Sequence, residues 1–514
     1  MSMRTKNSML NIITAVGFSL IVGLLSMFRL KLFVDYFGNE VNGFFSLSNS
    51  VSLAITFVEA GMGGIFIQKL YLLLANSDQK AITDLYLTVK RIAKIITMLI
   101  FCLALGYSFI HINKYSYLFG LNKTILIYWL FLIPTVFSYY LRVPAYVLMA
   151  DQKEYIVSFV GQLGNVLSYL IQILMLVFMR NLDITYISVI MFAFSVGPLI
   201  INHEIALNKY PYLRSHKGSF KFDKDVIYKM KDCLMGSISN AIMQSVDTLM
   251  LAYVSTASNN FKLSLISVIS IYNGIILLVK NIVQGFVAQV IASFGNAAHS
   301  DQQKFRYLYL AYIKVSFALC VAIFACLFGV INKFNLIFYD MGDSLLPISF
   351  VLVIVTNALL DIIKIPLLAA PVNIQGDYKF SRNVTSFEAI ANIALSYILL
   401  QLMGEIGLFV ATLIVQLVSV VILIPRKCYS LLHEKYSNYL IIFVKYCLLF
   451  LIIGWVNYIA MQNISVPTLI SFFIAAILLF GMDLSFVMFV SFGMYDDFTY
   501  VFETLTNKIL RGNS

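Results

Sequence analysis

Charged side chains are scarce in this sequence. Lysine, arginine, aspartate and glutamate together make up 12% of its 514 residues, whereas 60% are hydrophobic and the mean hydropathy is +0.87. Soluble globular domains are about a quarter charged and about half apolar, so this composition excludes a soluble core. Apolar stretches of about 20 residues recur from end to end, each long enough to cross a bilayer core. We therefore expect an integral membrane protein without a large soluble domain.

Motifs for metal binding, disulfide bonding and catalysis are also missing. The six cysteines include no CxxC pair and mostly fall in apolar stretches, so we expect free thiols. The five histidines lie far apart along the chain and form no ligand pattern. We predict no catalytic residue, no metal site and no cofactor, and we do not expect an enzyme.

The apolar stretches predict fourteen membrane spans, with boundaries placed to within about 4 residues. They begin near residues 9, 42, 92, 124, 155, 184, 233, 263, 307, 345, 381, 405, 439 and 467. The expected fold class is therefore an all-α integral membrane protein. An even number of spans puts both termini on the same side of the membrane.

Basic residues indicate which side that is. The N-terminus, the loops that follow even-numbered spans and the C-terminal tail hold most of the lysine and arginine. The positive-inside bias therefore predicts cytoplasmic termini. The longest polar connection, at residues 208–232, is expected to contact membrane lipids with anionic headgroups. The net charge of +11 is mainly this topology signal. Without an RNA or DNA motif it predicts no nucleic-acid partner.

The first and second halves of the chain resemble each other. The stretch "SDQKAITDLYLTVK" from Ser77 recurs as "SDQQKFRYLYLAYIK" from Ser300. Arg142 and Lys364, each two residues before a proline, stand at almost the same offset. Because the offset covers an even number of spans, we expect parallel six-helix repeats. Transporters built this way place the substrate between the halves and open alternately to each side.

The repeats divide the chain into four predicted parts. These are an N-lobe at residues 1–207, a cytoplasmic linker at 208–232, a C-lobe at 233–425, and a final segment at 426–514. Each lobe holds six spans. The final segment holds two extra spans and a cytoplasmic tail.

Basic residues inside the spans are candidate substrate ligands. A charge in mid-bilayer costs about 2.5–3.5 kcal/mol on insertion scales and is usually retained for function. Arg142, Lys280 and Lys364 lie in the fourth, eighth and tenth spans. The alternative for Arg142 and Lys364 is that they extend to the cytoplasmic headgroups. Their recurrence in both halves favours a substrate-facing role, and a guanidinium can hold two phosphate oxygens.

Acidic residues inside the spans are Glu59, Asp247 and Asp361. They are candidate countercharges to the basic residues or sites for a coupling cation. The alternative is an ion pair that only holds helices together. Asp361 lies one helical turn before Lys364, so these two side chains can pair directly.

Three stretches resemble bacterial polysaccharide flippases of the MOP (multidrug/oligosaccharidyl-lipid/polysaccharide) superfamily. They are "YFGNEVNGFFSLSNSVSLAITFVEAGMGG" from Tyr36, "SVDTLMLAYV" from Ser245, and "QGDYKFSRNVTSFEAIANIALSYILLQLMGEIGLFVATLIVQLV" from Gln375. The cluster of arginines that lipid II flippases of this superfamily carry in their first two spans is not seen. Arg29 comes late in the first span.

This resemblance implies a flippase in the bacterial cytoplasmic membrane. Such a protein moves undecaprenyl-diphosphate-linked oligosaccharide repeat units to the outer leaflet by alternating access, for surface polysaccharide biosynthesis. Its central cavity is cationic, which fits Arg142, Lys280 and Lys364. Polysaccharide polymerase and chain-length machinery are the implied protein partners.

Two other functions are open. A cation-coupled drug antiporter of the same superfamily needs acidic residues in its cavity and takes cationic substrates. A membrane polysaccharide polymerase is expected to carry a large outer loop with catalytic groups. The outer loops predicted here are short and hold no paired-carboxylate motif, which disfavours the polymerase.

Overall fold

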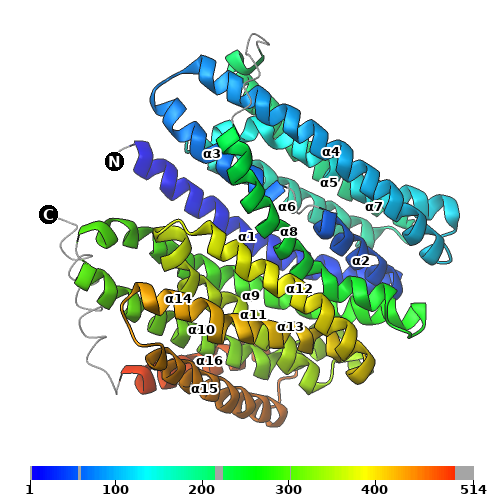
Figure 1. Cartoon of the computed structure of the whole chain (residues 1–514). Helices are drawn as coiled ribbons and strands as arrows, with labels where there is room; N and C mark the ends of the chain where they lie inside the picture. The colour runs from blue at the N-terminus through cyan, green and yellow to red at the C-terminus, as the bar shows by residue number, and fades with distance from the viewer. Residues whose placement is uncertain (1–2, 56–58, 215–223, 301, 493–514) are drawn as a thin grey trace. The chain divides into compact units, whose positions relative to one another are not determined.

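The computed structural model describes residues 3–55, 59–214, 224–300 and 302–492, and in that part of the chain every regular element is a helix (Figure 1). The first helices are α1 (Met3–Phe37), α2 (Asn39–Ile55), α3 (Glu59–Ala75), α4 (Gln79–Tyr115), α5 (Leu121–Ala150), α6 (Glu154–Phe178), α7 (Ile184–Lys209), the short turn η2 (Pro211–Arg214) and α8 (Lys224–Tyr253). They are followed by α9 (Asn259–Ser300), α10 (Gln302–Tyr339), η3 (Gly342–Ser344), α11 (Ile348–Leu368), η4 (Ala369–Ile374), α12 (Tyr378–Met403), α13 (Ile406–Val418), η5 (Ser419–Leu423), α14 (Ile424–Leu431), α15 (Tyr436–Asn463) and α16 (Leu469–Phe492).

These helices correspond to the predicted spans. Within the described residues, eleven stretches are long and apolar enough to cross a membrane. The other three predicted spans fall on α1, on α2 with α3, and on α8. The twelfth span is interrupted, because α13 passes through η5 into α14. The predicted fold class, an all-α membrane protein with about 14 spans, is confirmed.

The chain forms two compact units, Met1–Ile271 and Tyr272–Ser514. Their boundary lies inside α9. The whole of α8 therefore belongs to the first unit, where it packs on α2 and α3. The predicted N-lobe and C-lobe are defined by repeated sequence, whereas these two units are defined by packing. The lobe boundaries therefore stay a prediction.

The first unit is built around pairs of long helices. In it α1 lies along α6, and α5 lies along both α4 and α7. Its core holds several large aromatic side chains that are almost fully buried, among them Tyr86, Tyr128 and Tyr139. The Tyr128 hydroxyl donates to the Ala104 carbonyl at 2.9 Å, so the interior polar group is satisfied.

In the second unit, α10 is the central helix. It packs against α11, α15 and α16, and 78% of its most apolar stretch is buried, compared with 11% for α16 (Figure 1). A helix buried on all sides can be apolar all round, as α10 is. Beside it, α12 packs on α13, and α13 packs on α11.

Local sequence explains several helix ends. Asp78, Asp183 and Asp377 stand directly before α4, α7 and α12, and each carboxylate accepts a hydrogen bond from a backbone N–H of the first turn. Gly38 (φ 85°) and Gly404 (φ 70°) adopt positive φ between helices, where glycine is favoured.

Candidate functional site

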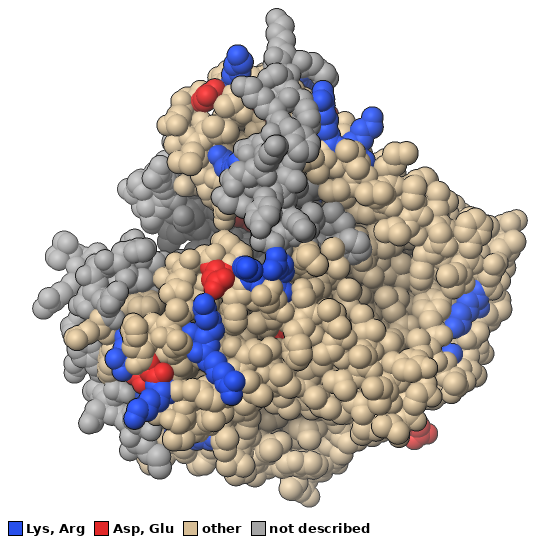
Figure 2. Space-filling model, viewed as in Figure 1, with Lys and Arg blue, Asp and Glu red and all other residues tan. Residues whose placement is uncertain are grey.

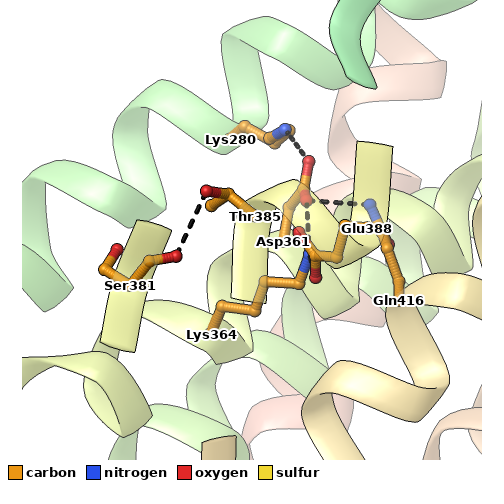
Figure 3. Close-up of polar contacts among 7 residues, drawn as sticks. All are labelled: Lys280, Asp361, Lys364, Ser381, Thr385, Glu388 and Gln416. Carbon is orange, nitrogen blue, oxygen red and sulfur yellow. Dashed lines mark hydrogen bonds and ion pairs between the residues drawn. The ribbon is translucent and has the colours of Figure 1, made fainter. Parts of the chain in front are cut away.

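The second unit holds a cluster of charged and amide side chains on its apolar helices (Figure 3). Its centre is Asp361 on α11. Lys280 reaches it from α9, Lys364 follows one turn later on α11, Glu388 comes from α12 and Gln416 from α13. Four helices thus contribute to one polar group, which we call the α11 cluster.

Asp361 binds three neighbours in this cluster. Its Oδ2 lies 2.8 Å from Lys280 Nζ, and its Oδ1 accepts a hydrogen bond from Gln416 Nε2 at 2.9 Å. Lys364 Nζ lies 3.8 Å from Oδ1. The predicted pairing of Asp361 with Lys364 is therefore the longest of the three contacts, and Lys280 is the closer basic partner.

Glu388 is the second carboxylate. Its Oε1 lies 2.7 Å from Lys364 Nζ, and its side chain is 6% exposed, whereas that of Asp361 is 39% exposed. In Figure 3, Lys280, Asp361, Lys364 and Glu388 form an alternating series of positive and negative groups. With both carboxylates ionised the cluster carries no net charge, and Asp361 is its most exposed member.

A polar stripe on α12 leads to the cluster. Ser381 and Thr385 lie on the turns before Glu388, and Thr385 Oγ1 donates to the Ser381 carbonyl at 3.1 Å (Figure 3). On the turns after Glu388, Asn392 and Ser396 are fully buried. The helical spacing of Ser381, Thr385, Glu388, Asn392 and Ser396 puts them on one face of α12. This polar spacing could have identified Glu388 from the sequence.

The structure brings together three of the six residues proposed from sequence, namely Lys280, Lys364 and Asp361. Arg142 has an exposed side chain on α5, and Asp247 is half-buried on α8, both in the first unit. Glu59 begins α3, and its side chain lies outside the described part. The roles of these three stay predictions.

Metal-ligating groups are not gathered anywhere in the described residues, where no three His, Cys, Asp or Glu side chains could hold an ion together. Five of the six cysteines are described and all five are free thiols, as predicted. Cys233 lies outside the described side chains.

Comparison with known proteins gives matches at the level of structure. No family model and no curated protein sequence matches the chain. The lipid II flippase MurJ in an inward closed conformation superposes with a TM-score of 0.65 at 17% identity, over 94% of this chain and 98% of MurJ. The chain has the fold of the MOP superfamily transporters.

Two further structures share this MOP fold. An inward-facing multidrug resistance MATE family transporter has a TM-score of 0.58 at 14% identity, over 82% of this chain and 98% of that one. A MOP superfamily transporter from Pyrococcus furiosus has a TM-score of 0.54 at 15% identity, over 83% and 96%. The MOP fold and the eleven apolar stretches together make this a multi-pass membrane protein.

Proposed function

We propose that this protein is a flippase that moves undecaprenyl-diphosphate-linked oligosaccharides across the bacterial cytoplasmic membrane by alternating access, for surface polysaccharide biosynthesis. A diphosphate and its sugars cannot cross hydrocarbon unaided, whereas a polyprenyl tail can remain in lipid. A protein that carries this substrate needs basic groups within its spans to bind the diphosphate. It needs no catalytic residues.

The observation that carries the proposal is the convergence of Lys280 and Lys364 on the Asp361 carboxylate. Two ammonium groups that share one carboxylate offer a diphosphate two donors at once, if the anion replaces Asp361. Asp361 is the most exposed of the four charged groups, so its side chain has the most room to turn away from the lysines when an anion binds them. Arg142, in the first unit, stays a proposed substrate ligand.

The extent of the structural matches also supports a flippase. MurJ covers 94% of this chain, whereas the MATE transporter covers 82%. The additional share is about as long as α15 and α16 together. The match to the flippase thus extends over more of this chain than the match to the antiporter does.

An antiporter of the MATE type is the second candidate, and Glu388 is the observation that favours it. This buried carboxylate balances the second lysine, so the α11 cluster is neutral rather than cationic. A cation that replaced the lysines would find two carboxylates, Glu388 and Asp361. Asp247 and Glu59 are proposed countercharges or coupling sites under either function.

Export of surface polysaccharide tests the flippase proposal. In a strain that lacks the chromosomal copy, Lys280→Gln, Lys364→Gln and Arg142→Ala should each lower export per molecule of protein in the membrane. Lys333→Gln is the matched control, because Lys333 also lies on a helix of the second unit and forms no ion pair with a described residue. Normal export by the Lys280→Gln, Lys364→Gln double variant contradicts the proposed site.

Two further measurements separate the candidate functions. A flippase defect causes lipid-linked repeat units to accumulate on the cytoplasmic leaflet. An antiporter instead drives uptake of cationic dyes into inverted vesicles when an ion gradient is applied. Dye transport without any effect on lipid-linked sugars favours the MATE-type function.

A further inference from the structure

π turns follow two of the helices that carry the α11 cluster. After Asp361 and Lys364, α11 passes into η4 at Ala369, and after Gln416, α13 passes into η5 at Ser419. A π turn contains one more residue than the α turn it replaces, and such turns are rare and are frequently found at functional sites. Each π turn begins within two helical turns of a cluster residue, since Lys364 precedes η4 and Gln416 precedes η5.

Prolines remove individual backbone donors at these turns. In a π turn, a backbone N–H bonds the carbonyl five residues earlier, as Gln375 N does with Ala370 O at 3.1 Å. Pro371 has no N–H for Pro366 O, five residues before it. Pro425 likewise has none for the carbonyls four and five residues before it, those of residues 421 and 420.

Three tyrosine hydroxyls bind these same carbonyls. Tyr309 Oη on α10 donates to Pro366 O at 2.6 Å. From α15, Tyr439 Oη donates to Val420 O at 2.6 Å and Tyr436 Oη donates to Val421 O at 2.6 Å. Tyr309 and Tyr439 are fully buried. Both carbonyls that an N–H at Pro425 would reach, and the carbonyl five residues before Pro371, thus accept a hydrogen bond from a hydroxyl. This matters because an unpaired carbonyl is costly in an apolar span.

We propose that Tyr309, Tyr436 and Tyr439 are positioning residues that hold η4 and η5 in the π form and so set the orientation of the α11 cluster toward the substrate's diphosphate. This inference rests on the proposed function. If a π turn relaxed to an α turn, one residue would leave the turn, and the flanking segments would rotate by roughly 100° relative to each other. Asp361, Lys364 and Gln416 would then face different neighbours.

The arrangement also gives α15 a role in binding. Two of the three hydroxyls come from α15, and the third comes from α10, which packs along α15. Neither helix contributes a side chain to the α11 cluster. They act on it only through the turns that follow α11 and α13.

Binding of inorganic diphosphate to the detergent-purified full chain tests the proposal. Tyr309→Phe, Tyr436→Phe and Tyr439→Phe should each weaken binding, by about tenfold if the lost hydrogen bond is fully expressed in the orientation of the lysines. Tyr128→Phe is the matched control, because it also removes a buried hydroxyl bonded to a helix carbonyl, but in the first unit. Affinities are compared well below each variant's melting temperature.

A merely structural role predicts a different result. In that case all four variants melt at a lower temperature and bind diphosphate as the wild type does, and the proposal is overturned. A selective loss of affinity in the three variants, with Tyr128→Phe unchanged, supports it.

Hydrogen exchange separates failure of this inference from failure of the proposed function. If the wild type does not bind diphosphate, the anion site is contradicted, and exchange of backbone amides still reports on the turns. The inference then expects altered exchange in residues 361–376 or 413–426 of the three variants and not of Tyr128→Phe. Unchanged exchange in both segments overturns it.

Discussion

Lys364 and Glu388 form an ion pair within the apolar helices of the second unit, with 2.7 Å between Nζ and Oε1. The side chains are 12% and 6% exposed, so both charges are largely removed from water. A buried ion pair adds little net stability, but removal of one partner leaves the other charge uncompensated. A substitution of only one of these two residues should therefore be costly.

Single substitutions in this pair should destabilise the protein strongly. We expect Glu388→Gln or Lys364→Gln to lower the free energy of unfolding by about 3–5 kcal/mol. The double substitution Lys364→Met, Glu388→Leu should recover most of that loss, because no charge is left unpaired. Thermal unfolding of the purified chain measures all three.

The exposed pair Arg214–Glu204 is the control for this prediction. Its atoms are 3.0 Å apart, but the side chains are 52% and 54% exposed. Arg214→Gln should change the free energy of unfolding by less than about 1 kcal/mol. Equal losses at the two pairs would show that burial does not determine the effect.

Composition alone predicted the helices, because an apolar stretch in lipid must satisfy its backbone within itself. It also placed most helix starts to within about 4 residues, but not that of α4. The third span was placed near residue 92, whereas α4 begins at Gln79, since Asp78 caps a polar first segment that the search for apolar residues leaves out. The π turns were also not predicted, because their hydroxyl donors come from residues distant in sequence.

Helical spacing predicted one contact of the α11 cluster. Asp361 and Lys364 are one turn apart, so their proximity follows from the helix itself. The shorter contact between Lys280 and Asp361 depends on which face of α9 meets α11, and no local pattern contains that information. Glu388 is not among the site residues proposed from the sequence, although it lies on the polar stripe of α12.

The pair of Asp183 and Lys123 should make stability depend on acid pH. Asp183 precedes α7, and its Oδ2 lies 2.5 Å from Lys123 Nζ. This hydrogen bond, followed by that from the Thr185 N–H, lowers the pKa of the Asp183 carboxyl to about 2. A lowered pKa contributes stability above the unfolded value of about 4, and that contribution is lost as pH falls from about 4 to about 2.

The variant that isolates this charge is Asp183→Asn, since asparagine can still cap α7. We expect it to melt slightly below the wild type at pH 7, because the pair is exposed and weak. The difference should shrink between pH 4 and pH 2. A difference that stays constant over this range would exclude the ion pair as its cause, and Lys123→Gln should show the same pH dependence.

Tyr253 fixes the end of α8 to α4. Its hydroxyl lies 2.7 Å from Nδ1 of His111, whose side chain is fully buried. We expect Tyr253→Phe to lower the free energy of unfolding by about 1–3 kcal/mol, because a buried ring nitrogen loses its partner. Backbone amides at the end of α8 should also exchange faster. Tyr397→Phe, at a tyrosine that is 57% exposed, should change neither quantity.

Gly329 allows a close approach between α10 and α15. A Cβ added to it would lie 2.4 Å from Asn457 Cβ and 2.9 Å from the Asn457 carbonyl carbon. Asn457 in turn donates from Nδ2 to Asp483 Oδ2 on α16 at 2.6 Å. A shift of α15 therefore strains a buried polar contact to α16 as well.

We expect Gly329→Ala to lower the free energy of unfolding by about 1–3 kcal/mol, the usual cost of overpacking. Gly481→Ala on α16 is the control, because a Cβ there meets nothing within 4 Å, and alanine favours a helix. Because α15 also carries Tyr436 and Tyr439, Gly329→Ala should weaken diphosphate binding together with stability. A loss of stability with unchanged binding would mean that α15 can move away from α10 while Tyr436 and Tyr439 stay hydrogen-bonded to η5.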